Sequence, residues 1–420
     1  MKVAVVIAAV AALRTTAAAD PLDELGFGAA GTGMATARTA IATGAEAAHE
    51  NPAGVARIDA PEALIGYSYA WNHLSIDGHG AGVDNARGTS LGLAVPIEIG
   101  GIRIAGAVAT YLPDQFLARI QLTPVSEPSF VRFATAQQRI VVEPVAAIDL
   151  GDVAIGAGAS ILADAQSRDL TFNVGGTAGK KSGTASLDLS LPLRAAPLVG
   201  VWWRALPNLE LAATFRGELS LDLALTITAN VNVPGVVTGD AIVSLKSASY
   251  FTPARGTLAA AYRPSPSVVY TGEVGFERWH ALGSGAPDLS IAIQLDVAPP
   301  IVNTTRPPAH FHDIPTVRLG TERGYGNWKL RGGLAWLPSP VPAQTGLTSF
   351  ADGDRYVVAA GVGRRVTHRW LTEPLELDVG VMYQHIQHEL IVKDFALQPG
   401  GAFSAGGDIL QGSASATVRF

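Results

Sequence analysis

The sequence predicts an all-β fold: a fourteen-stranded antiparallel transmembrane β-barrel with a small N-terminal hatch, or plug, in its lumen. The chain is apolar, with a mean hydropathy of +0.25 and only 16% charged residues, against about 25% in typical soluble proteins. Its longest charge-free run, residues 332–351, holds three prolines and cannot form a spanning helix. Apolar and polar residues alternate with period two over long segments. A closed barrel accounts for all three observations, because it pairs its backbone between strands and turns alternate side chains outward.

Composition excludes several other classes of protein. A hydrophobic content of 48% excludes a disordered chain. The absence of cysteine excludes disulfides, thiolate metal sites and a cysteine nucleophile. The net charge of −6 gives no reason to expect a nucleic-acid partner.

The N-terminus has the pattern of a secretory signal peptide, predicted over residues 1–19. Lys2 precedes an apolar run at residues 3–13, and three alanines at residues 17–19 precede Asp20. A membrane-anchoring helix is the alternative, but eleven apolar residues are too few to span a bilayer. The protein is therefore expected to be exported.

A compact segment, residues 20–60, is expected to follow the signal peptide. It is rich in glycine and alanine, and we expect one or two short helical turns in it. A small segment ahead of the first strand is a candidate plug for a barrel lumen. The barrel itself is predicted over residues 61–420.

The strand predictions depend on alternation between turn residues. In residues 209–227 the odd positions are apolar and most even positions polar, and residues 375–384 and 413–420 behave alike. Trp328 and Trp336 share one face, about 26 Å apart along a strand, which fits the two aromatic girdles of a membrane barrel. Tyr67, Tyr69 and Trp71 are a further girdle position. The fourteen predicted strands are residues 61–74, 88–99, 102–112, 137–150, 153–173, 184–204, 207–231, 238–263, 266–281, 313–325, 327–337, 353–367, 374–392 and 406–420.

The links between these strands alternate in length. Short links, such as residues 100–101 and 205–208, are expected to be periplasmic turns. The long links at residues 113–136 and 282–312 are expected to be extracellular loops. Five prolines in residues 282–312 argue against a central strand there.

Two groups of residues resemble the FadL/TodX family of outer-membrane transporters. The segment 26–57, with Asn51-Pro52-Ala53-Gly54, resembles the N-terminal hatch of that family. Residues 330–335, 339–344, 354–356 and 377–381 resemble its late barrel strands in order and spacing, and residues 311–320 and the closing Phe420 fit as well.

The resemblance implies a monomeric fourteen-stranded barrel in the outer membrane of a Gram-negative bacterium. It implies no enzymatic activity and no cofactor, but passive uptake of long-chain fatty acids or, alternatively, aromatic hydrocarbons. The implied partners are the hydrophobic ligand, outer-membrane lipid and lipopolysaccharide, and the barrel-assembly machinery through the C-terminal strand ending in Phe420.

The same resemblance implies a route for the ligand, from an apolar extracellular groove to a lateral exit near a kink of the third strand. Pro113 removes a ladder donor at the end of that strand. The predicted hatch and exit residues are Asn51, Pro52, Ala53, Leu112 and Pro113. The predicted groove residues are Phe116, Leu117, Ile120, Leu122, Phe130, Val131 and Phe133. Contacts to a ligand carboxylate are predicted for Arg119, Arg132 and Arg139, for which the alternatives are lipopolysaccharide phosphates or water.

Several other motifs carry less weight. The glycine pattern at residues 26–31 fits a dinucleotide fingerprint but lacks the βαβ unit that the motif needs. His385 and His388 fall on opposite faces of a strand, and Asp352-Gly353-Asp354 lacks further calcium ligands. No metal site is predicted.

Three other functions stay open at this point. A water-filled porin has a charged constriction loop and no plug. An outer-membrane lipase uses a serine and a histidine, but no G-x-S-x-G motif is present. An adhesin is the third. The hatch segment and the late-strand motifs favour the transporter over all of these.

Overall fold

The protein was analysed as a computed structural model. It describes the backbone of residues 13–15, 25–114, 122–124, 127–133, 139–163, 166–177, 180–190, 193–233, 237–283, 288–295, 298–301, 310–344, 348–367, 374–393 and 401–420. Side chains are described for residues 25–114, 127–133, 139–162, 193–220, 250–283, 310–344, 348–367, 374–393 and 401–420. The predicted signal peptide lies almost entirely outside these residues.

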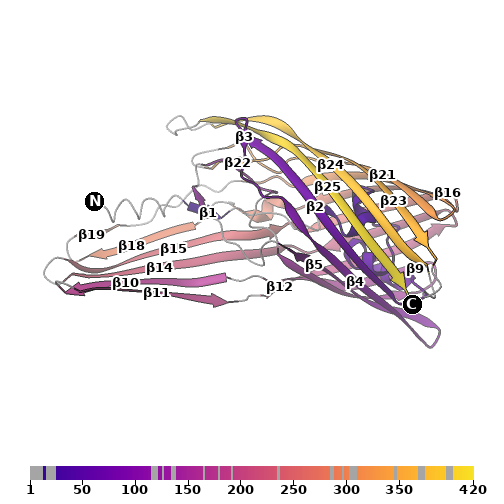
Figure 1. The fold of residues 1–420 in the computed structure, drawn as a ribbon, viewed down its shortest axis with the longest axis horizontal. Coiled ribbons are helices and arrows are strands. Elements are labelled where there is room, and N and C mark those ends of the chain that lie inside the picture. The colour runs from indigo at the N-terminus through magenta and orange to yellow at the C-terminus, as the bar shows by residue number, and fades with distance from the viewer. Residues whose placement is uncertain are drawn as a thin grey trace.

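Fourteen antiparallel strands form the wall of a closed barrel, as predicted (Figure 1). Neighbours along the wall are neighbours in sequence, and the last strand pairs with the first from Glu62–Arg419 to Ile76–Ala405. The strands are β2 (Glu62–Ile76), β4 (Ala86–Ile99), β5 (Ile102–Pro113), β8 (Ile140–Asp149), β9 (Val153–Ala163), β12 (Leu193–Leu206), β13 (Leu209–Arg216), β16 (Arg255–Ser265), β17 (Val268–Glu277), β20 (Ile314–Tyr325), β21 (Trp328–Leu337), β23 (Arg355–Val366), β24 (Leu375–Val392) and β25 (Ala402–Arg419). A two-residue strand, β3 (His79–Gly80), extends the hairpin from β2.

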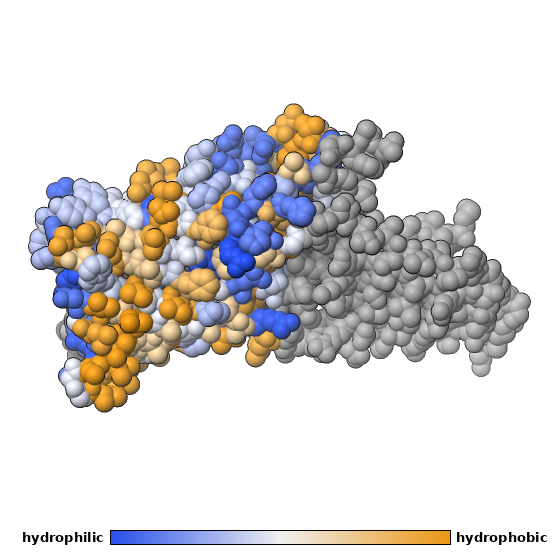
Figure 2. All heavy atoms as spheres, turned by 180° about the vertical axis from the view of Figure 1, so that it is seen from behind, coloured by the Kyte–Doolittle hydropathy of each residue, from blue (hydrophilic) through white to orange (hydrophobic). Residues whose placement is uncertain are grey.

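The outer wall carries the apolar half of the alternation, and Figure 2 shows apolar side chains gathered over it. Trp328 and Trp336 are exposed at the two ends of β21, with 45% and 37% of their surfaces accessible. Aromatic residues on other strands are exposed near the same two levels. They include Trp203, Tyr262, Tyr270 and Tyr325 beside the short turns, and Tyr67, Trp71, Phe276, Tyr356 and Tyr383 nearer the long loops. These positions fit the predicted aromatic girdles.

Four predicted strands were too long, and the structure divides each of them. The segments 153–173, 184–204, 207–231 and 238–263 each contribute one strand to the wall and one to a separate sheet that extends beyond the barrel (Figure 1). The order in this outer sheet is β11-β10-β14-β15-β18-β19, with β10 and β14 parallel. Its strands are β10 (Gln166–Thr177), β11 (Lys180–Ser190), β14 (Leu219–Val233), β15 (Val237–Thr252), β18 (Asp288–Leu295) and β19 (Ala298–Ile301).

The hatch lies inside the barrel and contains three short helical elements. They are α3 (Gly28–Thr32), α4 (Gly44–Glu50) and the 3₁₀ helix η1 (Pro52–Arg57). Gly28 and Gly44 begin the first two helices with positive φ angles of 75° and 64°, which glycine adopts without strain. Nearly every residue of the hatch is buried. No helix in the described part of the chain is both long and apolar enough to cross a membrane.

Candidate functional site

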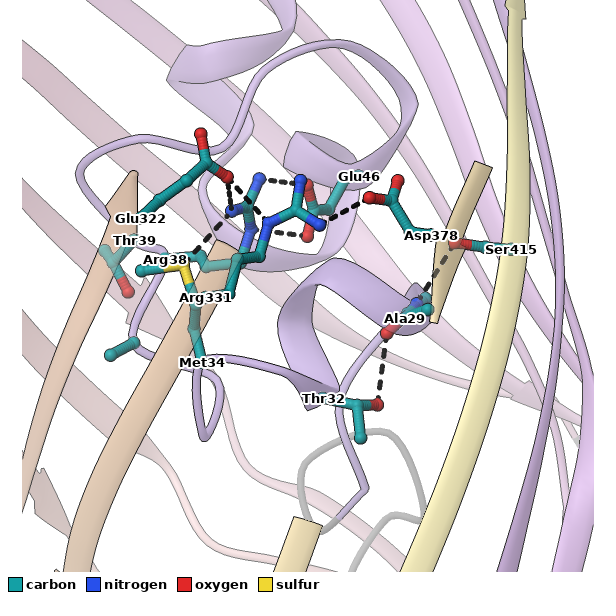
Figure 3. A network of polar contacts seen from close by, with 12 residues as sticks. Ala29, Thr32, Met34, Arg38, Thr39, Glu46, Glu322, Arg331, Asp378 and Ser415 are labelled. Atoms are coloured by element: carbon teal, nitrogen blue, oxygen red, sulfur yellow. Dashed lines mark hydrogen bonds and ion pairs between the residues drawn. The ribbon is translucent and has the colours of Figure 1, made fainter. Parts of the chain in front are cut away.

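Arg38, in the first half of the hatch, joins a network of ion pairs in the barrel wall (Figure 3). The guanidinium of Arg38 makes two hydrogen bonds of 2.7 Å with the carboxylate of Glu46, and it lies 3.8 Å from Glu322 on β20. Arg331 on β21 donates to Glu322 at 2.6 Å and also to Asp378 on β24. The pKa of Arg38 is raised: burial opposes the charged form, but the carboxylates of Glu46 and Glu322 outweigh it. Hatch and wall therefore share one charged network.

This network continues around the lower side of the hatch, next to the short turns. Lys329 pairs with Glu376, and Arg419 donates to Glu62 at 2.9 Å. Glu62 also accepts a hydrogen bond of 3.0 Å from the backbone N–H of Ala45. A small cavity of about 80 Å³ lies among these charges. An apolar molecule moving straight down would have to separate charged partners that are largely buried, which is costly.

The second half of the hatch lies against the opposite wall with small residues between them. At Gly200 on β12 an added Cβ would overlap Oδ1 of Asn51, and at Gly156 on β9 it would overlap the backbone of Pro52. Asn51 donates to the carbonyl of Thr39 at 2.9 Å and accepts from the N–H of Ala53 at 3.1 Å. Alanines and valines from the hatch and from β5 and β8 fill the rest of this contact. The two glycines allow the hatch turn to touch the wall directly.

A buried trio of polar residues stands within this apolar contact. His49 of α4 places Nδ1 2.8 Å from the carboxylate of Glu143 on β8. Arg216, at the end of β13, also pairs with Glu143 and donates to the His49 carbonyl at 2.8 Å. The pKa of His49 is raised: burial, the largest influence, acts to lower it, but the charge and hydrogen bond of Glu143 together with the charge of Glu50 outweigh burial and the nearby Arg216. The trio links the hatch to two wall strands.

The predicted exit residues of the hatch do not lie next to those predicted at the end of the third strand. Asn51, Pro52 and Ala53 are buried, and the first two contact β9 and β12. Leu112 and Pro113 are paired with Thr89 and Gly88 of β4 in an unbroken ladder. Through the register, Gly156 is level with Ala105 of β5. Leu112 lies seven residues further along β5, about 23 Å at 3.3 Å per residue.

The described groove residues form part of a packed cover over the barrel mouth. Phe130, Val131 and Phe133 have exposures of 1%, 3% and 7%. Phe130 belongs to β7 (Ser129–Phe130), which pairs with β22 (Phe350–Ala351). The three side chains pack in two apolar clusters with residues that include Leu25, Phe251, Trp279, Phe311 and Phe403. Phe116, Leu117, Ile120 and Arg119 lie outside the described residues, and only the backbone of Leu122 is described, in β6 (Leu122–Pro124).

The two described arginines that were predicted to meet a ligand carboxylate are buried. Arg132 lies 2.8 Å from the carboxylate of Asp352 and donates to the carbonyl of Gly353 at 2.9 Å. It thereby ties one extracellular loop to another. Arg139 precedes β8 and is 1% exposed.

Sequence reasoning missed the charged network and the His49–Glu143–Arg216 trio. The available signal was weak: Arg216 occupied a polar position in the alternating segment 209–227, so it was expected on the inner face. Nothing nearby in sequence indicated a partner, because Glu143 is 73 residues away. No cluster of three or more metal-ligating side chains occurs among the residues that the structure describes.

The sequence was compared with those of known proteins. No protein-family model matches the chain. The chain is 40% identical over 78 residues to the long-chain fatty acid transport protein of Salmonella typhi, which is 18% of this chain and 17% of the relative. It is 33% identical over 114 residues to alkane uptake protein A of Marinobacter nauticus, covering 26% and 25% of the two chains. The matches thus span a quarter or less of these relatives.

Solved structures are similar over nearly the full length. A Pseudomonas aeruginosa FadL homologue has a TM-score of 0.59 at 17% identity, covering 94% of this chain and 98% of that one. The CymD monoaromatic hydrocarbon channel has a TM-score of 0.57 at 15% identity, covering 95% and 98%.

The closed barrel of fourteen antiparallel strands with an internal hatch defines this chain, by its fold, as a plugged β-barrel. More particularly, it has the fold of the FadL/TodX family of outer-membrane transporters of hydrophobic compounds, which confirms the resemblance predicted from sequence.

Proposed function

We propose that this protein is a channel for passive uptake of hydrophobic compounds across the outer membrane, with capture at the barrel mouth and exit through the barrel wall. The proposal rests on one observation: below the barrel mouth, the residues that a ligand would meet straight down differ in polarity from those that it would meet at the side. Straight down lie the ion pairs of Arg38, Arg331 and their carboxylates. To the side lie mostly alanine, valine and glycine contacts, with one buried polar trio of His49, Glu143 and Arg216 among them. An apolar ligand loses least by moving sideways into the membrane.

Long-chain fatty acids are the proposed substrates. The curated relative quoted at 40% identity is a fatty acid transport protein. Aromatic hydrocarbons are the second candidate, because the similar CymD structure is a monoaromatic hydrocarbon channel. The mouth residues Phe130, Val131 and Phe133 remain our proposed capture site, and contact with lipopolysaccharide, recognition of Phe420 by the assembly machinery and a monomeric state remain proposals.

Uptake of labelled compounds tests this function. Gram-negative cells that lack their own transporter of this type are compared with and without the protein, using labelled oleate, labelled toluene and a labelled small sugar. Faster entry of oleate supports the fatty acid channel, and faster entry of toluene alone supports the hydrocarbon channel. Entry of the sugar alone would overturn the proposal in favour of a porin.

A further inference from the structure

The hydrogen-bonded ladder between β8 and β9 is interrupted in the middle of the barrel wall. Val142 pairs with Ile161 and Val145 with Gly158, but the two positions between them, residues 143–144 and 159–160, form no bridges. In the described wall, the other ladders are continuous apart from irregularities beside two short turns and at residues 387–388, nearer the extracellular end of β24. The interruption at β8 is therefore distinctive.

Proline and glycine explain why the ladder is weak there. Pro144 has no N–H to donate, and Pro197 of β12 stands opposite Ala159 on the other side of β9. Gly158 allows the carbonyl of Pro144 to approach closely, since an added Cβ would overlap that oxygen. At this point β8 and β9 touch each other, but fewer hydrogen bonds join them than elsewhere in their ladder. Separating two strands costs least where no ladder bonds have to be broken.

The inner side of the interruption is covered by the buried trio. Glu143 is one of the unbridged residues, with no exposed surface. Its carboxylate binds His49 of the hatch and Arg216 of β13. Both partners come from elements other than β8 and β9, so these bonds hold β8 against the hatch without closing the ladder itself. The hatch turn at Asn51 and Pro52 contacts the same region of the wall, at Gly156 and Gly200.

We propose that the lateral exit lies between β8 and β9, at residues 143–144 and 159–160, and that Glu143, His49 and Arg216 form the latch that keeps it closed. This inference rests on the proposed function and differs from the exit expected at Leu112 and Pro113, where the ladder to β4 is intact and the ladder to β8 ends at Tyr111. Opening requires β8 and β9 to move apart over a short length. The apolar hatch contact leads to this place, and the charged network lies on the other side of the hatch.

Disulfide staples test the position of the exit, and the absence of native cysteine gives a clean background. Ala146→Cys with Ala157→Cys joins outward-facing residues directly opposite each other just below the interruption. Val142→Cys with Ile161→Cys does the same just above it. Opposite residues in antiparallel strands are close enough for a disulfide. Heat-dependent mobility on gels checks that each variant folds.

Two matched pairs serve as controls. Leu334→Cys with Val358→Cys staples β21 to β23 on the far wall, and Thr89→Cys with Leu112→Cys staples β4 to β5 beside Pro113. We expect oxidation of either β8–β9 pair to reduce oleate uptake at least tenfold, with recovery on reduction, while both controls keep uptake within twofold. Normal uptake with the β8–β9 staples, or a block by the β4–β5 staple alone, overturns the exit position. If the unaltered protein takes up neither oleate nor toluene, the proposed function itself is overturned.

The latch is tested by Glu143→Gln in the Ala146→Cys, Ala157→Cys background. With the thiols reduced, we expect uptake to rise two- to fivefold, because a neutral amide binds Arg216 and His49 less strongly. Oxidation should abolish the gain. Unchanged or slower uptake in the reduced, folded variant overturns the latch while leaving the exit position to the staples.

Discussion

The two halves of the hatch are held to the barrel in different ways. Residues 28–46 meet a network of ion pairs on β20, β21 and β24, which Arg38 joins through Glu322. Residues 47–57 meet β8, β9 and β12 mainly through small apolar side chains and one polar trio, and Arg57 pairs with Glu210 of β13. Ion pairs that are cut off from water resist partial separation, since each charge left behind is costly. Contacts between alanine and glycine carry no such penalty. The comparison teaches that one side of the hatch is an anchor and the other a surface that can part.

The largest effect is expected from Arg331→Met. Arg331 is nearly inaccessible and faces Glu322, Glu376 and Asp378. Its removal leaves carboxylates without a partner, so we expect a loss of about 3–5 kcal/mol in the free energy of unfolding, measured by urea titration in lipid vesicles. Arg204→Met, at an exposed ion pair with Asp152, is the matched control. A loss below about 1 kcal/mol in Arg331→Met would contradict the anchor.

A smaller effect is expected at the apolar contact. Gly156→Ala places a methyl group into the backbone of Pro52, and overpacking of this kind costs about 1–3 kcal/mol. Gly256→Ala, where nothing lies within 4 Å of the added atom, is the control. Equal stability of the two variants would show that the hatch already stands away from β9.

Glu50, at the end of α4 in the second half of the hatch, predicts a pH dependence of stability. Burial raises the pKa of Glu50 to about 7, so the folded state holds its proton more tightly than the unfolded state. Stability from this group is therefore full below its ordinary pKa and falls as pH rises toward 7. We expect Glu50→Gln to stabilise the protein by about 3 kcal/mol at pH 8 and to change little at pH 4. The same gain at both pH values would contradict this assignment.

The smallest effect is expected from Arg263→Ala. Arg263 pairs with Glu210 at 3.4 Å and is partly exposed, and such pairs contribute less than about 1 kcal/mol. Thermal unfolding should shift only slightly, and 1 M salt should remove the difference from the unaltered protein. A loss comparable to that of Arg331→Met would mean that the anchor extends around the whole hatch.

The strands of the barrel wall could be predicted from the sequence, but the separate outer sheet could not. Alternation placed all fourteen wall strands, because one face meets lipid and the other the lumen. It failed to separate β13 from β14, since the outer sheet has the same two-residue period and only Gly217 and Glu218 intervene. Segment 282–312 contributes no strand to the barrel wall, but the expectation that it holds no central strand was wrong for the outer sheet. There β18 lies between β15 and β19, and only β19, which contains Pro299 and Pro300, lies at the edge.

The candidate site was predicted less well than the fold. The hatch turn at Asn51 was found because its residues resemble a family motif. Arg38 and Glu322 are 284 positions apart, and Glu143 and Arg216 lie on strands that are not adjacent. Such pairs depend on how the barrel closes around the hatch, and local sequence patterns carry no information about that.

The seam between β2 and β25 bears on how the molecule is made. It joins residues as far apart as Glu62 and Arg419, so the barrel cannot close until its last strand has paired with its first. The hatch precedes every wall strand in the chain. We expect the wall strands to assemble around the hatch during folding. The β2–β25 pairing is expected to form last, because it has the greatest loop-closure entropy to overcome.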